Sequence, residues 1–562
     1  MQQSTSSLTL RNPWVLIAAF LILLGPFALD FHMHYPDEIY YRDAAVKMLQ
    51  TEDYLTTYLG SGELRFKKPI LTYWAVLAGF KLVGVNAFGS RIFFLLAGAA
   101  TVGITYLLGK VLFRDQKIAS LSAWIMAANP ILLLSSARSI PDILLVMTMG
   151  LAALGFAGLL RDGVRAPKKY LWLMYLGLGL AFEVKGLPAL ALGGLGILFL
   201  RFNPWQSVSW KTLIYLPAVF YGGGIAIFWF AAMWILHGPQ FLEGFLDDQV
   251  GIRVTSRLWL ILSNGALAVL LLLGMLLPWI ALLRTGKEVW KKAWKENPQF
   301  FAFALLWGLA ILGMGALTSK FYERYLLPVA PILSVYLAWM LTKGEIFQRI
   351  KAVKIALGVM FIFLLILFGA NVWVLFGEKT QWWSWFTVGI GLILLASFGW
   401  VGAHRSQHGP LLISFSFFLV FFLLSGITRI ISLPHQGEQA KVKLKDRALD
   451  APIGFVGNLH VGSKIRMSLG PGYQVVDLPK EKWKELSPSY SYLIVEDKLL
   501  SDGDTVLYQL ETLSREWKSK AIPRVFLAYP HASLGASLPE NVTTYFFLEK
   551  KSTAQAARDY LQ

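Results

Sequence analysis

The sequence predicts a polytopic α-helical membrane protein that carries a soluble α/β domain at its C-terminal end. The chain has 562 residues, of which 56% are hydrophobic and only 15% are charged. Its mean hydropathy of +0.54 is far above that of ordinary soluble proteins. Many apolar runs reach the roughly 20 residues that the hydrocarbon core of a bilayer requires. The composition then becomes much more polar near residue 434.

About thirteen membrane spans are expected from these runs. The first, residues 14–29, lacks a signal-peptidase cleavage pattern and is therefore interpreted as an anchor. Residues 70–84 are expected to form a further, short apolar helix, which is not among the thirteen spans. The expected spans cover residues 14–29, 90–113, 118–134, 143–160, 170–185, 187–201, 212–236, 258–283, 300–318, 325–341, 355–377, 382–402 and 410–432.

Basic loops set the expected orientation. The loops at 114–117, 161–169, 284–299 and 343–354 are rich in Lys and Arg, and all fall on one side of the predicted topology. Such loops remain cytoplasmic, so the net charge of +18 is mainly an orientation signal. No basic patch with aromatics occurs on a soluble module, which argues against nucleic-acid binding. The absence of cysteine excludes disulfides and thiolate metal sites.

The chain divides into a transmembrane domain, 1–433, and an outer domain, 434–562. Apolar runs at 454–456, 492–495, 524–527 and 545–548 are typical of strands, with helix-like segments between them. About 130 residues are enough for an independent core. An odd number of spans places this domain on the outer side of the membrane.

The long polar loop 32–68 holds two adjacent acids, Asp37 and Glu38. Apolar spacing between Asp37 and Gln50 predicts an amphipathic helix lying on the membrane surface. Two interpretations of the acids are open. They could favour the helix macrodipole, each by about 0.3–1 kcal/mol. Alternatively, they supply a general base or an orienting carboxylate at the outer face.

Further acids lie near the ends of later spans. Asp142 stands at the mouth of a span, where an ionisable group is a functional candidate. The alternatives are a helix cap beside Pro141 or a salt bridge to Arg138. Glu183 and Lys185, between two apolar spans, are expected to form a structural intramembrane pair rather than a catalytic one.

Several cations lie on the outer side, against the usual bias. They are Lys68, Arg253, Lys320 and Arg324. One interpretation is that their side chains extend to lipid phosphates. The other is a clamp for a lipid-linked phosphate, for which Arg supplies a two-pronged donor and Lys a point charge.

Five motifs carry a family resemblance. They are Asp37-Glu38-x-x-Tyr41, Lys68-Pro69 with Tyr73-Trp74, Ala137-Arg138 with Asp142, Lys185-Gly186 with Pro188, and Tyr325-Leu326-Leu327-Pro328-x-x-Pro331. In this order and topology they resemble the GT-C membrane glycosyltransferases, within them the protein O-mannosyltransferase-like group, and most closely the lipid A aminoarabinose transferases (ArnT). The resemblance covers about 31–331 by motif and the whole chain by architecture.

The resemblance implies a polyprenyl-phosphate sugar as donor and a periplasmic active site. It implies that Asp37 is the main catalytic carboxylate and Asp142 a second functional acid, with Glu38 beside them. Lys68 and Arg253 would hold the donor phosphate. The remaining candidates for phosphate binding are Tyr325, Tyr322, Lys320, Arg324 and Arg138.

Two departures from the family leave a metal site and the sugar open. The family commonly has an acid where this chain has Lys67, and often a His in the region of 246–253. His32 and His34 lie near the acids without a clear ligand spacing. A divalent metal therefore stays possible but is not indicated.

The expected reaction moves a sugar, 4-amino-4-deoxy-L-arabinose, from undecaprenyl phosphate to a lipid A phosphate at the bacterial inner membrane, by a monomer. Cations would stabilise the departing phosphate. Asp37 would deprotonate a hydroxyl acceptor, or orient one that is already ionised. The alternatives are transfer to protein or another glycan, and a lipid or sugar transporter. Transporters place polar residues at the midplane of repeated, broken helices, whereas here they cluster on one face without a repeat.

Overall fold

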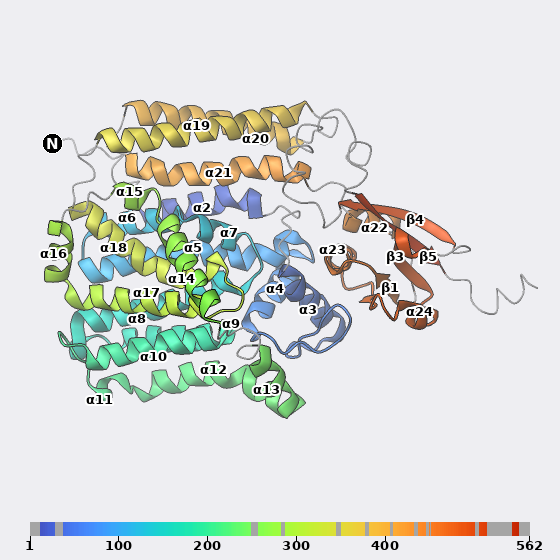
Figure 1. Cartoon of the computed structure of the whole chain (residues 1–562), viewed down its shortest axis with the longest axis horizontal. Coiled ribbons are helices and arrows are strands. Elements are labelled where there is room, and N and C mark those ends of the chain that lie inside the picture. Colours follow the sequence, from blue (N-terminus) through green and yellow to red (C-terminus); the bar gives the residue numbers. More distant parts are fainter. Residues whose placement is uncertain are drawn as a thin grey trace, which may run out of the picture.

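A bundle of long helices with a small α/β domain at one end forms the molecule (Figure 1). The computed structural model describes residues 12–28, 37–248, 257–282, 287–343, 350–376, 382–404, 409–431, 436–444, 449, 451–500, 505–513 and 542–549. The fold class predicted from the sequence is confirmed.

Each expected span has a helical counterpart. Among the described residues, eight helices are long and apolar enough to cross a membrane, or nine if the bent pair α6–α7 is one span. Others, such as α2 and α10, are shorter apolar helices. The helices are α2 (Pro13–Ala28), α5 (Ala87–Phe113), α6 (Gln116–Ala127), α7 (Pro130–Ser136), α8 (Pro141–Asp162), α9 (Lys169–Lys185), α10 (Leu187–Phe202), α12 (Leu216–His237), α14 (Leu258–Met275), α17 (Pro298–Ala316), α18 (Ala330–Lys343), α19 (Ile350–Leu375), α20 (Trp382–His404) and α21 (Gly409–Ile431).

Two spans that the sequence predicts as continuous are broken. The span 118–134 bends by 63° between α6 and α7. The Asn129 side chain accepts hydrogen bonds from the N–H groups of Ile131 and Leu132, which starts a new helix at Pro130. The span 258–283 divides into α14 and α15 (Trp279–Leu282), because Pro278 has no N–H to continue the helix.

Helix α3 (Glu38–Thr51) lies between the bundle and the α/β domain. It forms where the sequence predicts a helix. It packs against α4 (Leu71–Val83) on one side and against α23 (Leu459–Leu469) on the other. Most of its side chains are consequently buried, charged ones included.

The C-terminal domain holds a five-stranded sheet in the order β2-β1-β3-β5-β4. Strand β1 pairs in parallel with β2 and β3, whereas β5 is antiparallel to β3 and β4. Three of the expected strands are present, the fourth (524–527) lies outside the described residues, and β2 and β4 are additions. The elements are α22 (Gln436–Leu444), β1 (Ile453–Val456), α23, β2 (Val475–Asp477), α24 (Trp483–Leu486), β3 (Tyr492–Glu496), β4 (Val506–Leu513) and β5 (Val542–Glu549).

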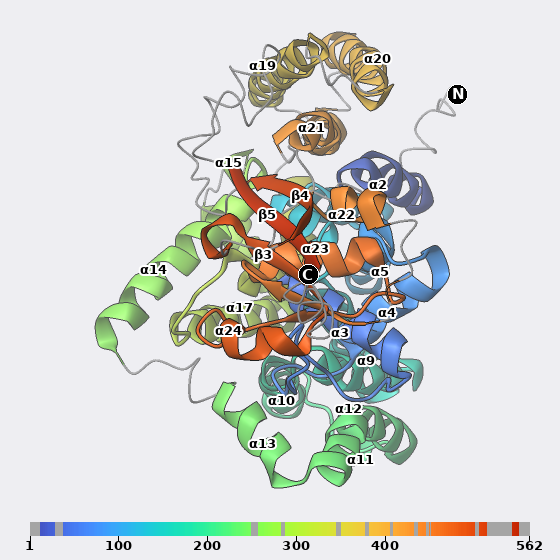
Figure 2. The same cartoon turned by 90° about the vertical axis from the view of Figure 1, so that its right-hand side faces the viewer.

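The basic loops meet at the other end of the bundle. Arg114 lies 3.9 Å from Asp162, and Lys343 lies 3.7 Å from Glu296. Helix α16 (Lys287–Glu296) stands at the end opposite the sheet domain (Figure 1). Figure 2 looks onto the sheet-domain end, where that domain covers the middle of the bundle. The remaining short elements are η1 (Gly163–Arg165), α11 (Trp210–Leu213), α13 (Pro239–Leu246) and η3 (Glu323–Val329).

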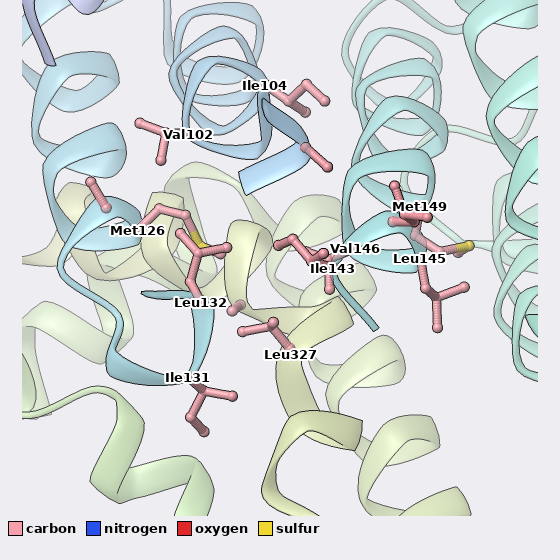
Figure 3. Packing of buried hydrophobic residues seen from close by; sticks show 14 of the residues in the cluster. Val102, Ile104, Met126, Ile131, Leu132, Ile143, Leu145, Val146, Met149 and Leu327 are labelled. Carbon is pink, nitrogen blue, oxygen red and sulfur yellow. The ribbon is translucent and has the colours of Figure 1, made fainter. Parts of the chain in front are cut away.

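A close-packed apolar core joins the helix ends that carry the polar residues. Side chains from α5, α6, α7, α8 and η3 meet in it (Figure 3). Because lipid chains are as apolar as leucine, this packing stabilises the bundle chiefly through van der Waals contact. The labelled members are Val102, Ile104, Met126, Ile131, Leu132, Ile143, Leu145, Val146, Met149 and Leu327.

Candidate active site

Asp142 is the centre of a buried charge cluster. It lies in the first turn of α8, directly after Pro141. Its Oδ1 accepts a hydrogen bond of 2.6 Å from Lys185 Nζ, and its Oδ2 accepts one of 3.0 Å from Arg324 Nε. The side chains of Asp142 and Arg324 are each only 4% exposed. Strong ion pairs of this kind are rare in an apolar bundle and mark a functional candidate.

Arg324 connects this cluster to Asp37. Its Nη2 donates to Asp37 Oδ2 at 2.9 Å, so one guanidinium joins two carboxylates. The Asp37 side chain is 41% exposed, unlike its partner. Although Asp37 precedes α3 directly, its side chain makes no capping hydrogen bond. The geometry therefore favours the site interpretation of Asp37 over the helix-start interpretation.

Two tyrosines flank the cations. The guanidinium of Arg324 lies 4.0 Å from the ring centre of Tyr322, and Lys185 Nζ lies 4.3 Å from that of Tyr325. Arg324 and Tyr325 belong to the 3₁₀ turn η3, which packs against α8, and Tyr322 directly precedes that turn. Aromatic faces attract cations in such positions, so the tyrosines fix the direction of both cationic groups.

The other predicted cations differ in position. Lys68 is buried just before α4, and its ammonium acts electrostatically on Asp142. Arg138 is half-buried between α7 and α8, and Lys320 is exposed. Arg253 lies outside the described residues, as do His32 and His34. Within the described ranges, no group of three His, Asp or Glu side chains could hold a metal ion.

Glu38, although adjacent to Asp37, faces the interior of the bundle. Its two carboxylate oxygens accept from Arg91 Nε and Nη2, both at 2.8 Å. Oε1 also accepts from the N–H and hydroxyl of Ser139, at 2.8 and 3.0 Å. Burial alone would raise the pKa of Glu38. The charge and hydrogen bonds of Arg91, the charge of Arg42 and the hydrogen bond from the Ser139 N–H together outweigh burial and lower the pKa to about 2. These contacts join α3 to the loop before α8.

The expected pair of Glu183 with Lys185 is wrong. Lys185 binds Asp142, whereas Glu183 accepts a hydrogen bond of 3.0 Å from the N–H of Trp229. Side chains two positions apart on a helix point to different faces, which prevents the pair. Lys185 is thus a site residue that the sequence reasoning missed. A signal existed: the lysine ends an apolar helix, directly before Gly186 with its positive φ of 66°.

An apolar cavity of about 450 Å³ lies near the cluster on the bundle side. It is bounded by α4, α9 and α12 and opens outward. Two lining residues, Ile70 and Leu71, follow Lys68 by two and three positions in the sequence. A third, Glu183, precedes Lys185 by two positions on α9. The lining residues are Ile70, Leu71, Trp74, Leu180, Glu183, Phe220, Tyr221, Gly224, Ile225 and Phe228.

Sequence comparisons give distant relatives. Residues 14–238 match the model of the dolichyl-phosphate-mannose-protein mannosyltransferase family. An uncharacterized protein of Aquifex aeolicus is 26% identical over 326 residues, 57% of this chain and 61% of the relative. An undecaprenyl phosphate-α-4-amino-4-deoxy-L-arabinose arabinosyl transferase of Pseudomonas fluorescens is 27% identical over 355 residues, 61% of this chain and 57% of the relative. The chain thus matches less than two thirds of the length of these relatives.

The fold is also that of a solved structure. The crystal structure of ArnT from Cupriavidus metallidurans, bound to undecaprenyl phosphate, superposes with a TM-score of 0.66. The match covers 88% of this chain and 96% of that one, at 17% sequence identity. Sequence identity at that level shows a shared fold and no more, and the similarity of sequence comes from the family model and the relatives. By fold, this chain is similar to ArnT, and over residues 14–238 its sequence is similar to the mannosyltransferase family.

Proposed function

We propose that this chain is a glycosyltransferase that takes a sugar from undecaprenyl phosphate and transfers it to a lipid-borne acceptor. One observation carries the proposal: Arg324 joins a buried acid, Asp142, to a half-exposed acid, Asp37. A buried frame that presents one accessible carboxylate suits a reaction at the membrane boundary, where the acid can touch substrate without losing its orientation.

The chemistry divides between the cations and Asp37. The bond between the anomeric carbon and the phosphate oxygen breaks, and the phosphate leaves with the electron pair. Lys68 and Arg253 would stabilise that developing charge, with Tyr322 and Tyr325 alongside. Phosphate is a good leaving group, so no proton donor is required. Lys185 and Arg324 hold Asp142 and thereby fix the guanidinium that orients Asp37.

The role of Asp37 depends on the acceptor. With a hydroxyl acceptor, Asp37 takes the proton as the new glycosidic bond forms. With an ionised phosphate acceptor, Asp37 orients the sugar and stabilises the positive charge on its anomeric carbon. Glu38 takes no part in either version, because Arg91 and Ser139 occupy its carboxylate in the bundle interior.

The substrates we propose are 4-amino-4-deoxy-L-arabinose on undecaprenyl phosphate as donor and a lipid A phosphate as acceptor. The names of the relatives from Pseudomonas fluorescens and Pectobacterium atrosepticum support the donor. The cavity beside Lys68 would receive the first part of the lipid chain. Transfer to protein or another glycan is the second candidate, favoured by the name of the matching family model.

We also propose that the site and a domain spanning 434–562 face the periplasm of a bacterial inner membrane, in a monomer. The basic loops, which remain cytoplasmic in membrane proteins, gather at the end of the bundle opposite this domain. Protease added outside right-side-out vesicles should cut within the domain, and full protection would contradict this orientation.

The test compares cells that lack the protein with cells that express it or its Asp37→Asn variant. We expect lipid A to gain one aminopentose only with the unaltered protein, as measured by mass spectrometry. Total glycoprotein from the same cells is measured in parallel. A change in glycoprotein with unchanged lipid A would favour the second candidate. No change in either would overturn the proposed function.

A further inference from the structure

A buried guanidinium attaches the C-terminal domain to helix α3. Arg466, on α23, donates to Asp43 Oδ1 and Oδ2 at 3.1 and 2.8 Å. The same group donates to Asp477 Oδ1 and Oδ2 at 2.8 and 2.9 Å. The side chains of all three residues are between 6 and 7% exposed. Asp43 belongs to α3, so the contact crosses between two parts of the chain that are far apart in sequence.

We propose that Arg466 is a positioning residue for the transfer reaction. The two hydrogen bonds from Arg466 to Asp43 fix the position of α3, and α3 in turn presents Asp37 to the site. The proposal rests on the proposed function, since it assumes that Asp37 acts in sugar transfer. It gives the C-terminal domain a task in the reaction beyond its own stability.

Helix α3 connects the Arg466–Asp43 contact to Asp37. Asp43 follows Asp37 by six residues, a rise of about 9 Å along a helix. Glu38 and Arg91 hold the start of α3 to the bundle. At the other end of α3, the Gln50 side chain donates to the carbonyl oxygens of Pro471 and Tyr473, at 3.3 and 3.0 Å. The domain therefore holds the middle and the end of the helix that leads from Asp37.

The same pair of residues orders the loop that leads to Lys68. The N–H of Asp477 donates to the carbonyl oxygen of Gly60 at 3.2 Å. A Cβ atom on Gly60 would lie 2.3 Å from Arg466 Nη2 and 2.4 Å from Asp477 Oδ2. Because five hydrogen bonds fix that guanidinium, it cannot move aside, and only glycine permits so close an approach. Lys68 follows eight residues later. One contact thus orders both the acid and the cation of the site.

The alternative is that the ion pairs only keep the domain attached. That alternative predicts less folded protein but the same activity per folded molecule. A positioning role predicts a lower kcat in protein that remains folded, because displacement of a reacting group by about 1 Å can cost ~10²-fold in rate. The two interpretations are therefore separable by measuring kcat and KM on purified, folded protein.

The variants are Asp43→Asn and Arg466→Gln in the full-length protein, reconstituted in lipid nanodiscs. We expect kcat to fall ~10- to 100-fold, with a smaller change in KM for the undecaprenyl-phosphate sugar. Lys480→Gln is the matched control, since it breaks an exposed ion pair of 2.7 Å with Glu496 in the same domain. Its kcat should equal that of the unaltered protein.

A double variant keeps the test decisive if a single change lowers the yield. Asp43→Arg combined with Arg466→Asp exchanges the charges across the contact and leaves one arginine facing two aspartates, and we expect it to recover part of the lost kcat. Normal kcat in folded Asp43→Asn and Arg466→Gln would overturn the proposal. Losses in both single variants that merely follow the folded fraction, with no recovery of kcat per folded molecule in the double variant, would overturn it as well.

Hydrogen exchange separates this inference from the proposed function. Arg466→Gln should accelerate amide exchange across α3 (Glu38–Thr51), whether or not the protein transfers sugar. Unchanged exchange in α3 would overturn the positioning role even in an active enzyme. Faster exchange in a protein that transfers no sugar would instead count against the proposed function.

Discussion

Two buried arginines each join a pair of carboxylates, and in both cases one carboxylate comes from α3 or from the residue directly before it. Arg324 joins Asp37 to Asp142, and Arg466 joins Asp43 to Asp477. Around Arg466 both acids are sealed, at 6 and 7% exposure. Around Arg324 one acid, Asp37, is 41% exposed.

The difference lies in access rather than in chemistry. A guanidinium between two carboxylates is the same ion-pair unit at both places. The sealed unit of Arg466, Asp43 and Asp477 cannot touch a substrate and acts only through the elements that it holds, whereas the open unit of Arg324, Asp37 and Asp142 presents a carboxylate to a substrate. Glu38 sharpens the contrast, because it is adjacent to Asp37 and yet fully buried against Arg91. Substitutions at Asp37 should change turnover directly, whereas substitutions in buried groups can change it only through the position of the elements that they hold.

The largest effect is expected at Glu38, the fully buried acid next to Asp37. Glu38→Gln leaves Arg91 charged and buried without its partner, which typically costs about 3–5 kcal/mol. We expect a lower thermal unfolding temperature for the purified variant. Asp497→Asn, at an exposed position, is the control for loss of one carboxylate. Unaltered stability of Glu38→Gln would contradict the structural role of this pair.

Acid should remove the same contribution in the unaltered protein. The pKa of Glu38 is lowered from its usual value of 4.5 to about 2. A lowered pKa means that the pair stabilises the fold fully above pH 4.5 and that this stability declines as pH falls toward 2. The difference in unfolding temperature between Glu38→Gln and the unaltered protein should therefore shrink on acidification.

The open acid should behave in the opposite way. Asp37→Asn keeps the size and the hydrogen bonding of the side chain but deletes its charge. We expect transfer to fall by ~10²-fold or more, with donor affinity and unfolding temperature near normal. Transfer and donor binding are measured on the same purified variant. Full activity would remove Asp37 from the mechanism and would end the distinction between open and sealed units.

Composition and span length suffice to predict the bundle, because a bilayer admits few alternatives. They do not predict which polar groups meet. Asp37 and Arg324 are separated by 287 positions, and the sequence could nominate both but not pair them. Asp142 was likewise nominated, whereas its bond to Lys185 depends on the rotation of α9, which a pattern of apolar residues does not fix.

The burial of α3 was beyond prediction for a related reason. Its apolar spacing is typical of a surface helix, and its charged residues strengthen that interpretation. The cover comes from α23, whose Arg466 is 423 positions away from Asp43. A pattern within one helix cannot report a partner so distant, so Asp43 and Glu38 were indistinguishable from solvent-exposed acids.

A smaller effect is expected at the cation beside the open unit. Lys68→Ala should weaken binding of the undecaprenyl-phosphate donor by roughly 1.5–3 kcal/mol, the range of a charge-assisted hydrogen bond. Lys67→Ala is the matched control. The Lys67 side chain is 49% exposed, and its Nζ lies 3.9 Å from Asp248 Oδ1, which is a long ion pair. Arg253→Ala should resemble Lys68→Ala. Equal donor affinity in the Lys68 and Arg253 variants would eliminate the phosphate clamp.

The smallest effect should come from filling the apolar cavity, and it tests whether the open unit draws its substrate from the bilayer. Gly224 lines the cavity, and a Cβ atom there would meet nothing within 4 Å, so a leucine can extend into the space. Its neighbour Gly223 also has room for a Cβ atom but does not line the cavity, which makes it the matched control. Both changes replace a helical glycine with a better helix former, so any common gain in stability cancels.

We expect Gly224→Leu to raise KM for the long-chain donor while Gly223→Leu leaves it unchanged. A donor with a truncated lipid chain should lose less affinity in Gly224→Leu, because the occupied volume then matters less. Equal KM values for the two leucine variants would mean that the donor chain lies elsewhere.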